Sequence, residues 1–206
     1  MRGGKNLSEP FFSVIVPAHN AAEYIRKGLS SIRMQAFTDY ELIVVADDCN
    51  DDTAMIALDY ADKCLIRRHG LDGLARNDGL DVAAGKWILF MDDDDWWMNK
   101  TCFGKIANAV HAMDPDVLLF GFYWNTRGVY FQTMKQRVIA VWSKCWKREF
   151  IGDTRFPAKP YWSDVDFDRA MFDKYPKVST LNDSLYYYNY LRPGSISWRK
   201  EKGEIY

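Results

Sequence analysis

Apolar runs alternate with helical patterns through the first half of the chain. Four short runs rich in β-branched and aromatic residues predict strands, and the longest of them do not alternate with polar positions, which is typical of strands buried on both faces. These runs occupy residues 12–16, 41–46, 64–67 and 87–91. Between them, apolar residues recur three and four positions apart, which predicts amphipathic helices.

Polar residues mark where these helices begin. Asn20 can cap the helix after the first strand, and Asp51 or Asp52 can cap the helix after the second. A loop and a third helix occupy residues 70–84, and Gly85 ends that helix.

This alternation predicts an α/β fold with a Rossmann-like, mostly parallel central sheet and helices on both faces. Ligands bind such sheets at the carboxyl ends of the strands. Three polar clusters follow strands there, at residues 17–20, 47–48 and 92–95. We therefore expect the three clusters to meet at one edge of the sheet and to form a site.

The pattern is less regular after residue 95. It predicts helices at about 100–113, 141–150 and 163–172, strands at 116–123 and 184–190, and a polar hairpin at 125–128. At 206 residues, the length fits a single domain, 1–206, or one domain with a small lobe.

Composition excludes disorder and gives no general reason to expect a nucleic-acid or anionic-membrane partner, because 48% of residues are hydrophobic and the net charge is −1. The charge is nevertheless uneven. Residues 1–134 carry 13 basic and 19 acidic side chains, whereas residues 135–206 carry 14 basic and 9 acidic ones. This difference indicates either a metal site beside an anion or acceptor site, or ordinary surface charge.

The four cysteines show neither paired nor metal-ligand spacing, so we interpret them as free thiols in a reducing compartment. The polar N-terminus does not resemble a secretory signal, and no segment approaches the roughly 18–20 apolar residues that span a bilayer. These features predict a cytoplasmic protein, with contact at the inner face of the membrane left open.

Four adjacent aspartates, Asp92 to Asp95, directly follow the predicted strand 87–91. Adjacent carboxylates repel one another unless a cation neutralises them. Oxygen ligands suit Mg²⁺ or Mn²⁺, and an ion held by one or two carboxylates keeps positions for a substrate's phosphates. The alternative is a solvated acidic turn that caps the next helix, but the position at the end of a buried strand favours the metal site.

Two other candidates have both a functional and a structural interpretation. Asp47 and Asp48 either accept hydrogen bonds from a base or ribose, or form a turn. Arg76, in the third predicted helix, either neutralises a diphosphate or pairs with an aspartate at the surface.

One of Asp164, Asp166 and Asp168 can serve as a general base, and the other two suit a solvated helix N-terminus. The three histidines are isolated and are interpreted as non-catalytic, although His19 follows the first strand. The chain lacks the phosphate loop of P-loop kinases, the glycine fingerprint of Rossmann dehydrogenases and the nucleophile elbow of α/β-hydrolases, which disfavours those classes.

Six segments taken in order along the chain are more specific than any one motif. They are SVIVPAHNAAEYIRKGLSSI at 13–32, ELIVVADDCNDDT at 41–53, GLARNDGLDVAAGKWILFMDDDDWW at 73–97, VWSKCWKREF at 141–150, YWSDVDFDRAMF at 161–172 and YNYLRPGSIS at 188–197. Over nearly its whole length the chain resembles the inverting glycosyltransferase family 2. The resemblance implies a GT-A fold, with about 10–98 binding the nucleotide sugar and about 99–206 forming a smaller acceptor side.

The resemblance, together with the chemistry above, assigns site residues. Asp94 is the expected principal metal ligand, with Asp92 on the metal or ribose, and Asp95 can share that work. Asp47 is expected to read the uracil, and Asp164 is expected to be the catalytic base. The residues expected to bind the nucleotide sugar are Pro17, Ala18, Asn20, Asp47, Arg76, Asp92 and Asp93.

Three positions depart from the family pattern. Ala46 stands where the family often has its first Asp, Asp48 stands where it has Gly, and Ser163 replaces the Glu before Asp164. The first two weaken the assignment of uracil, and the third leaves Asp166 as an alternative base.

The expected function is transfer of a sugar, with inversion, from a nucleoside diphosphate sugar to a hydroxyl acceptor, using Mn²⁺ or Mg²⁺ and an aspartate base. UDP-sugar is the expected donor and a glycan the expected acceptor. The excess of basic residues in the second half leaves modified nucleic acid as a further possible acceptor, whereas the net charge of −1 disfavours it. The alternatives are an inactive sugar-nucleotide or glycan-binding module and a nucleotidyltransferase, which would need a basic, glycine-rich loop after the first strand.

Overall fold

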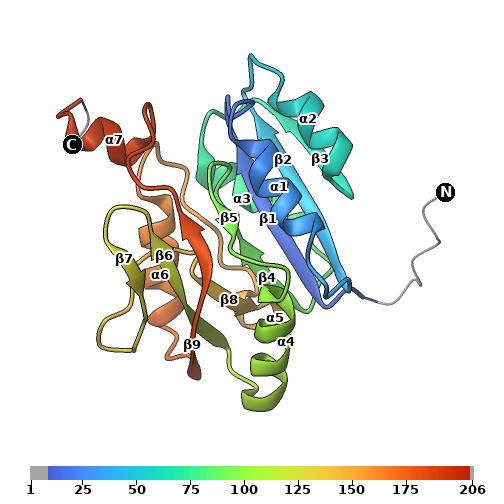
Figure 1. Cartoon of the computed structure of the whole chain (residues 1–206), viewed down its shortest axis with the longest axis vertical. Coiled ribbons are helices and arrows are strands. Elements are labelled where there is room, and N and C mark those ends of the chain that lie inside the picture. Colours follow the sequence, from blue (N-terminus) through green and yellow to red (C-terminus); the bar gives the residue numbers. More distant parts are fainter. Residues whose placement is uncertain (1–8, 205–206) are drawn as a thin grey trace.

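The computed structural model describes residues 9–204, which form one mixed sheet flanked by helices (Figure 1). The strands are β1 (Phe12–Ala18), β2 (Tyr40–Asp47), β3 (Lys63–Arg67), β4 (Trp87–Phe90), β5 (Trp96–Trp97), β6 (Val117–Trp124), β7 (Gly128–Tyr130), β8 (Lys144–Lys147) and β9 (Val178–Tyr188). The helices are α1 (Ile25–Arg33), α2 (Thr53–Tyr60), α3 (Asp72–Val82), α4 (Cys102–Met113), α5 (Arg148–Ile151), α6 (Ser163–Phe172) and α7 (Ile196–Glu201).

The strands run in the order β3-β2-β1-β4-β8-β6-β9-β5, and β7 pairs with β6. β1 pairs in parallel with β2 and β4, and β2 pairs in parallel with β3. Beyond β4, antiparallel pairs join β8 to β4 and to β6, while β6 and β9 are parallel. The predicted parallel α/β half is therefore confirmed, and the second half extends the same sheet with mixed pairing.

Two hydrophobic cores cover the two faces of the sheet, because alternate side chains of each central strand point to opposite faces. Val14 of β1 packs in the core under α1, α2 and α4, whereas Ile15 packs in the core under α3 and α6. Figure 1 shows α1 and α3 on opposite sides of β1. Helices on both faces explain why these strands have no polar alternation.

The predicted helix at 141–150 is wrong. Residues 144–147 form β8, and only 148–151 are helical. β8 has strands on both sides, and its neighbouring side chains Cys145 and Trp146 enter opposite cores. Burial on both faces removed the polar positions that distinguish a strand from a helix.

Two further predictions need correction. Asn20 does not cap α1, which begins at Ile25; Asn20 has a left-handed φ of 47° and its side chain accepts a hydrogen bond from the Asn50 amide. Of the two possible caps for α2, it is Asp51 whose carboxylate accepts from the amide of Thr53, at 3.0 Å. The last strand also begins at 178 rather than at 184.

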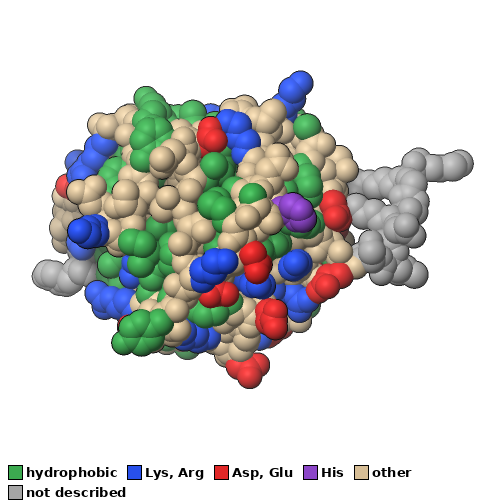
Figure 2. Space-filling view, turned by 90° about the horizontal axis from the view of Figure 1, so that it is seen from below, with side chains coloured by type: hydrophobic (Ala, Val, Ile, Leu, Met, Phe, Trp, Pro, Cys, Tyr) green, Lys and Arg blue, Asp and Glu red, His purple; other side chains and the backbone are tan. Residues whose placement is uncertain are grey.

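Within residues 9–204, no helix is long and apolar enough to cross a membrane. Figure 2 shows the end of the molecule where the parallel strands begin, and basic and acidic side chains lie interspersed near the middle of that face. The unequal charge of the two halves therefore does not produce a patch of one sign there. The four cysteines are free thiols, as predicted.

Replacement of Gly85 by alanine is expected to destabilise the contact between β1 and β4. A Cβ atom at Gly85 would lie 2.4 Å from the backbone nitrogen of Ser13 and 2.5 Å from the carbonyl carbon of Phe12. The backbone must move to relieve this overlap, so we expect a loss of about 1–3 kcal/mol in the free energy of unfolding, measured by urea denaturation. Gly104→Ala is the matched control, because nothing lies within 4 Å of the added atom. Equal stability of the two variants would contradict this packing.

Candidate functional site

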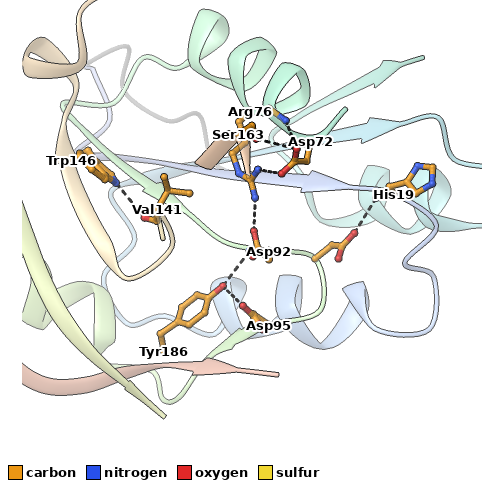
Figure 3. Close-up of polar contacts among 11 residues, drawn as sticks. His19, Asp72, Arg76, Asp92, Asp95, Val141, Trp146, Ser163 and Tyr186 are labelled. Atoms are coloured by element: carbon orange, nitrogen blue, oxygen red, sulfur yellow. Dashed lines mark hydrogen bonds and ion pairs between the residues drawn. The ribbon is translucent and has the colours of Figure 1, made fainter. Parts of the chain in front are cut away.

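The predicted polar clusters meet at the carboxyl ends of β1, β2 and β4, beside the start of α6 (Figure 3). His19, which follows β1, forms hydrogen bonds to the ends of both β2 and β4. Its amide donates to the carboxylate of Asp93 at 2.9 Å, and its Nδ1 lies 2.8 Å from the carbonyl oxygen of Asp47. His19 therefore organises the edge, a role that its isolation in the sequence did not indicate.

The residues expected to bind the nucleotide sugar differ in how far their side chains are buried. Pro17 and Ala18 are buried within β1, whereas His19 and Asn20 are exposed beyond its end. Asp47 is buried at the end of β2, and its two oxygens accept from the amides of His69 and Leu71, at 2.6 and 3.1 Å. The carboxylate of Asp47 thus holds the loop that precedes α3.

Asp48 explains one departure from the family pattern. Its φ is 52°, in the left-handed region that glycine adopts most readily. Aspartate is among the residues that tolerate this conformation. The turn after β2 therefore keeps a glycine-like backbone although the glycine is absent.

Each of the four adjacent aspartates has its own partners. Asp92 accepts from Arg76 Nη2 at 2.7 Å, Asp93 from the His19 amide, and Asp94 from Arg192 Nε at 2.6 Å. Asp95 is fully engaged, because its oxygens accept from the Tyr186 hydroxyl at 2.7 Å and from the Asn189 amide at 2.8 Å. Asp95 therefore anchors the cluster to β9.

The other three carboxylates suit a divalent cation. Their second oxygens accept no hydrogen bond from any residue in the described part of the chain. Burial and the neighbouring charge of Asp94 raise the pKa of Asp92 to about 6, against the pull of Arg76, and raise the pKa of Asp93 to about 7. Oxygen ligands under mutual repulsion fit Mg²⁺ or Mn²⁺.

Within residues 9–204, no three potential protein ligands converge on one point. An ion at this site would therefore have few protein ligands, as Mg²⁺ commonly does when substrate phosphates complete its coordination.

Arg76 is not the surface residue that one interpretation predicted. Its side chain is buried and lies between Asp72 and Asp92, with N–O distances of 2.5 and 2.7 Å (Figure 3). The charges of these two carboxylates and of Asp164 raise the pKa of Arg76 against the effect of burial. Arg76 therefore joins the acidic cluster to Asp72, which in turn accepts a hydrogen bond from Ser163 at the start of α6.

Asp164 lies in the first turn of α6, and burial raises the pKa of its carboxyl, while the nearby charge of Arg76 opposes that rise. Asp166 has a side chain that is 43% exposed and pairs with Lys159. Asp168 is completely buried and pairs with Arg137 and Lys144, so the interpretation as a solvated helix N-terminus is wrong for Asp168.

Sequence reasoning missed three partners of the predicted residues: Asp72, Tyr186 and Arg192. Tyr186 connects Asp92 to Asp95, since its hydroxyl accepts from the Asp92 amide and donates to the Asp95 carboxylate. Arg192 lies within the segment YNYLRPGSIS, which carries part of the family resemblance, but the sequence does not indicate that it pairs with Asp94. Nothing in the spacing of Asp72 indicated that it faces Ser163.

The aromatic residues near the predicted acceptor side separate into two groups. Trp142 and Trp146 are buried in the two cores. Tyr161 and Trp162 are half-buried, just before Asp164, and Lys200 lies 4.6 Å from the ring centroid of Trp162. Only the second group remains available to contact a ligand.

The fold and the order of the site segments agree with comparisons to known proteins. The model of glycosyl transferase family 2 matches residues 13–180. The chain belongs to this family and has the GT-A fold.

Two similar curated proteins are bacterial glycosyltransferases. The glycosyltransferase GlyA of Streptococcus pneumoniae is 27% identical over 90% of this chain and 31% of its own length. The poly(ribitol-phosphate) β-N-acetylglucosaminyltransferase TarS of Staphylococcus aureus is 31% identical over 89% of this chain and 36% of its own length. The chain thus spans about a third of the length of these relatives.

Solved structures give the same fold. TarS 1–349 in complex with UDP-GlcNAc superimposes with a TM-score of 0.79 and 28% identity, covering 89% of this chain and 59% of that one. The mannosyltransferase PcManGT of Pyrobaculum calidifontis, solved with GDP-Man and Mn²⁺, has a TM-score of 0.73 at 16% identity, covering 96% of this chain and 62% of that one.

Proposed function

We propose that this chain transfers a sugar from a UDP-sugar to a hydroxyl acceptor with inversion of configuration. The observation that carries the proposal is the convergence of Asp92, Asp94, Arg76 and Asp164 at one edge of a family 2 GT-A sheet. In this arrangement residues 10–98 bind the donor and residues 99–206 form the acceptor side.

Asp94 and Asp92 would hold the divalent ion, and the ion would neutralise the diphosphate of the donor. Arg192 pairs with Asp94 and would supply a second positive charge to the same phosphates. Arg76 acts from inside the protein: its buried guanidinium pairs with Asp72 and Asp92 and compensates their negative charge.

Asp164 is the proposed general base. Its carboxylate takes the proton of the acceptor hydroxyl while that oxygen attacks the anomeric carbon opposite the leaving diphosphate. A single displacement of this kind inverts the anomeric configuration. Burial makes the Asp164 carboxylate more basic than an exposed one, and the positive charge of Arg76 keeps it from being protonated too readily.

The donor proposal rests on similarity to TarS, whose structures contain UDP and UDP-GlcNAc. Asp47 would act on the base through the loop that its carboxylate holds, since both of its oxygens already bind backbone amides. The acceptor would approach along Tyr161 and Trp162, whose rings can stack on a sugar or polyol.

Binding of UDP is expected to raise the melting temperature only when Mn²⁺ is present. A ligand at about 100 times its dissociation constant adds roughly 2.7 kcal/mol to the free energy of unfolding. We expect this stabilisation with UDP and Mn²⁺, and its loss with EDTA or in Asp94→Asn. Asp114→Asn is the control. Its side chain is 70% exposed and lies near Phe11 and Lys86, where β1 and β4 begin, at the opposite end of these strands from the site.

The outcomes separate the possible functions. Stabilisation by UDP without release of UDP from any UDP-sugar would indicate an inactive binding module. Release of pyrophosphate from a nucleoside triphosphate would indicate a nucleotidyltransferase. Absence of stabilisation by every nucleoside diphosphate tested would contradict the proposed donor site.

A further inference from the structure

Asp72, the first residue of α3, joins three groups that belong to different parts of the site. One of its oxygens lies 2.5 Å from Arg76 Nη1, and the other accepts hydrogen bonds from the Gly73 amide at 2.8 Å and from the Ser163 hydroxyl at 3.1 Å. Figure 3 shows Asp72 beside Arg76 and Ser163. The Asp72 carboxylate therefore lies at the point where α3 meets α6.

The contact between the two helices is close enough to exclude a larger side chain. A Cβ atom at Gly73 would lie 2.8 Å from Cβ of Ser163 and 3.0 Å from the carbonyl oxygen of Pro157. Ser163 is completely buried. Position 163 is therefore fixed against α3 by packing on one side and by the Asp72 carboxylate on the other.

Apart from the partly exposed pair of Asp166 with Lys159, the start of α6 has little other polar support. The residue before the helix, Trp162, has a left-handed φ of 62°, and its side chain forms no capping hydrogen bond. Farther along, Asp168 fixes the second turn through Arg137 and Lys144. The first turn, which carries Asp164, is instead restrained through Ser163.

We propose that Asp72 is a positioning residue for Asp164: it holds Ser163 directly and Arg76 as an ion pair, and so fixes the start of α6 relative to the acidic cluster. This inference rests on the proposed function, in which Asp164 is the base. Asp72 does not touch the reacting atoms in this proposal. It orients the groups that do.

The geometry also indicates a second way to place the same negative charge. The Ser163 hydroxyl already points at the Asp72 carboxylate, so a glutamate at 163 would extend its own carboxylate in that direction, towards Arg76. In the wild type the Asp72 carboxylate occupies that place, and Asp72→Ala removes it. Position 163 is also where the family resemblance places a glutamate.

The test moves the carboxylate from 72 to 163. We would compare wild type, Asp72→Ala, Ser163→Glu and the double variant Asp72→Ala/Ser163→Glu. Release of UDP from UDP-GlcNAc with Mn²⁺ gives kcat and KM, and titration with UDP and Mn²⁺ gives the dissociation constant of UDP. Melting temperatures are measured on the same samples. Asp81→Ala is the matched control, an exposed, ion-paired aspartate on the same helix.

Misplacement of a catalytic group by about 1 Å can cost on the order of 100-fold in rate. We expect Asp72→Ala to lower kcat by about 10- to 100-fold, with KM and the dissociation constant of UDP changed by less than about threefold. The double variant should recover most of the lost kcat and of the melting temperature, while Ser163→Glu alone should lower both. Asp81→Ala should resemble wild type.

Several results would overturn the inference. Wild-type kcat in Asp72→Ala would show that Asp72 positions nothing. A larger change in the dissociation constant of UDP than in kcat would place its effect on the donor. A double variant whose kcat and melting temperature are no better than the combined single variants would show that the carboxylate is not interchangeable between the two positions. A wild-type protein that neither binds UDP nor releases it from any UDP-sugar would instead contradict the proposed function, and the inference with it.

Discussion

Asp164→Asn is expected to lower kcat for sugar transfer by about 10²–10⁴-fold, because an amide cannot accept the proton of the acceptor hydroxyl. Asparagine has nearly the same shape, so the start of α6 should keep its contacts. Asp164 lies near Arg76, which pairs with Asp92, but Asp164 itself forms no hydrogen bond with the carboxylates proposed to bind the nucleotide sugar. The dissociation constant of UDP with Mn²⁺ should therefore change little. Release of UDP from UDP-GlcNAc, followed with and without acceptor, measures the effect.

The pH dependence gives an independent check on the base. Burial raises the pKa of Asp164, and a base must be ionised to act. The rate of the wild type should therefore fall on acidification at a pH above that at which an exposed aspartate is protonated. At saturating Mn²⁺ and donor, which would hold the carboxylates of Asp92 and Asp94 ionised, the residual rate of Asp164→Asn should not show that acidic limb.

Asp166→Asn is the control for the same helix, because Asp166 is half-exposed and pairs with Lys159. Its kcat should remain within about threefold of wild type, since exposed ion pairs contribute little. Loss of kcat in Asp166→Asn, together with normal turnover in Asp164→Asn, would move the role of base to Asp166.

The parallel half of the fold could be predicted because its strands are short, apolar and separated by helical patterns. The strand β8 could not, since Cys145 and Trp146 are both apolar while they face different cores. The buried side chain of Lys144 added to the error: a lysine in the sequence indicates a solvated position unless its partner is known. That partner, Asp168, is on another element.

The same limit applies to the site. The carboxyl-end rule predicts that Asp47 and the aspartates at 92–95 lie at one edge, and the structure places them there. It does not predict which charges pair. Arg192 pairs with Asp94, 98 positions earlier in the sequence, and Arg76 pairs with both Asp72 and Asp92. Such choices depend on side-chain packing between elements that the sequence order leaves unspecified.

Asp168 belongs to a buried charged cluster whose disruption is expected to have the largest effect on stability. Asp168 and Lys144 are both completely buried, and their charged atoms lie 2.9 Å apart. Arg137 also pairs with Asp168, and the Lys144 ammonium donates to the carbonyl oxygens of Val138 and Ala140. Burial lowers the pKa of Lys144 to about 8, although Asp168 favours its charged form. The aspartate is thus what keeps this lysine charged inside the core.

Asp168→Leu should lower the free energy of unfolding by about 3–5 kcal/mol, the usual cost of removing one partner of a buried ion pair. Lys144→Met/Asp168→Leu should recover most of that loss, because the buried ammonium is removed as well. In the single variant, part of the stability should return as the pH is raised above neutrality. Lys144 then loses its proton, and a buried amine with a lowered pKa binds fewer protons folded than unfolded, so stability rises with pH. Urea denaturation at several pH values measures both effects. A single variant that is as stable as the double variant at every pH would show that Lys144 does not depend on Asp168.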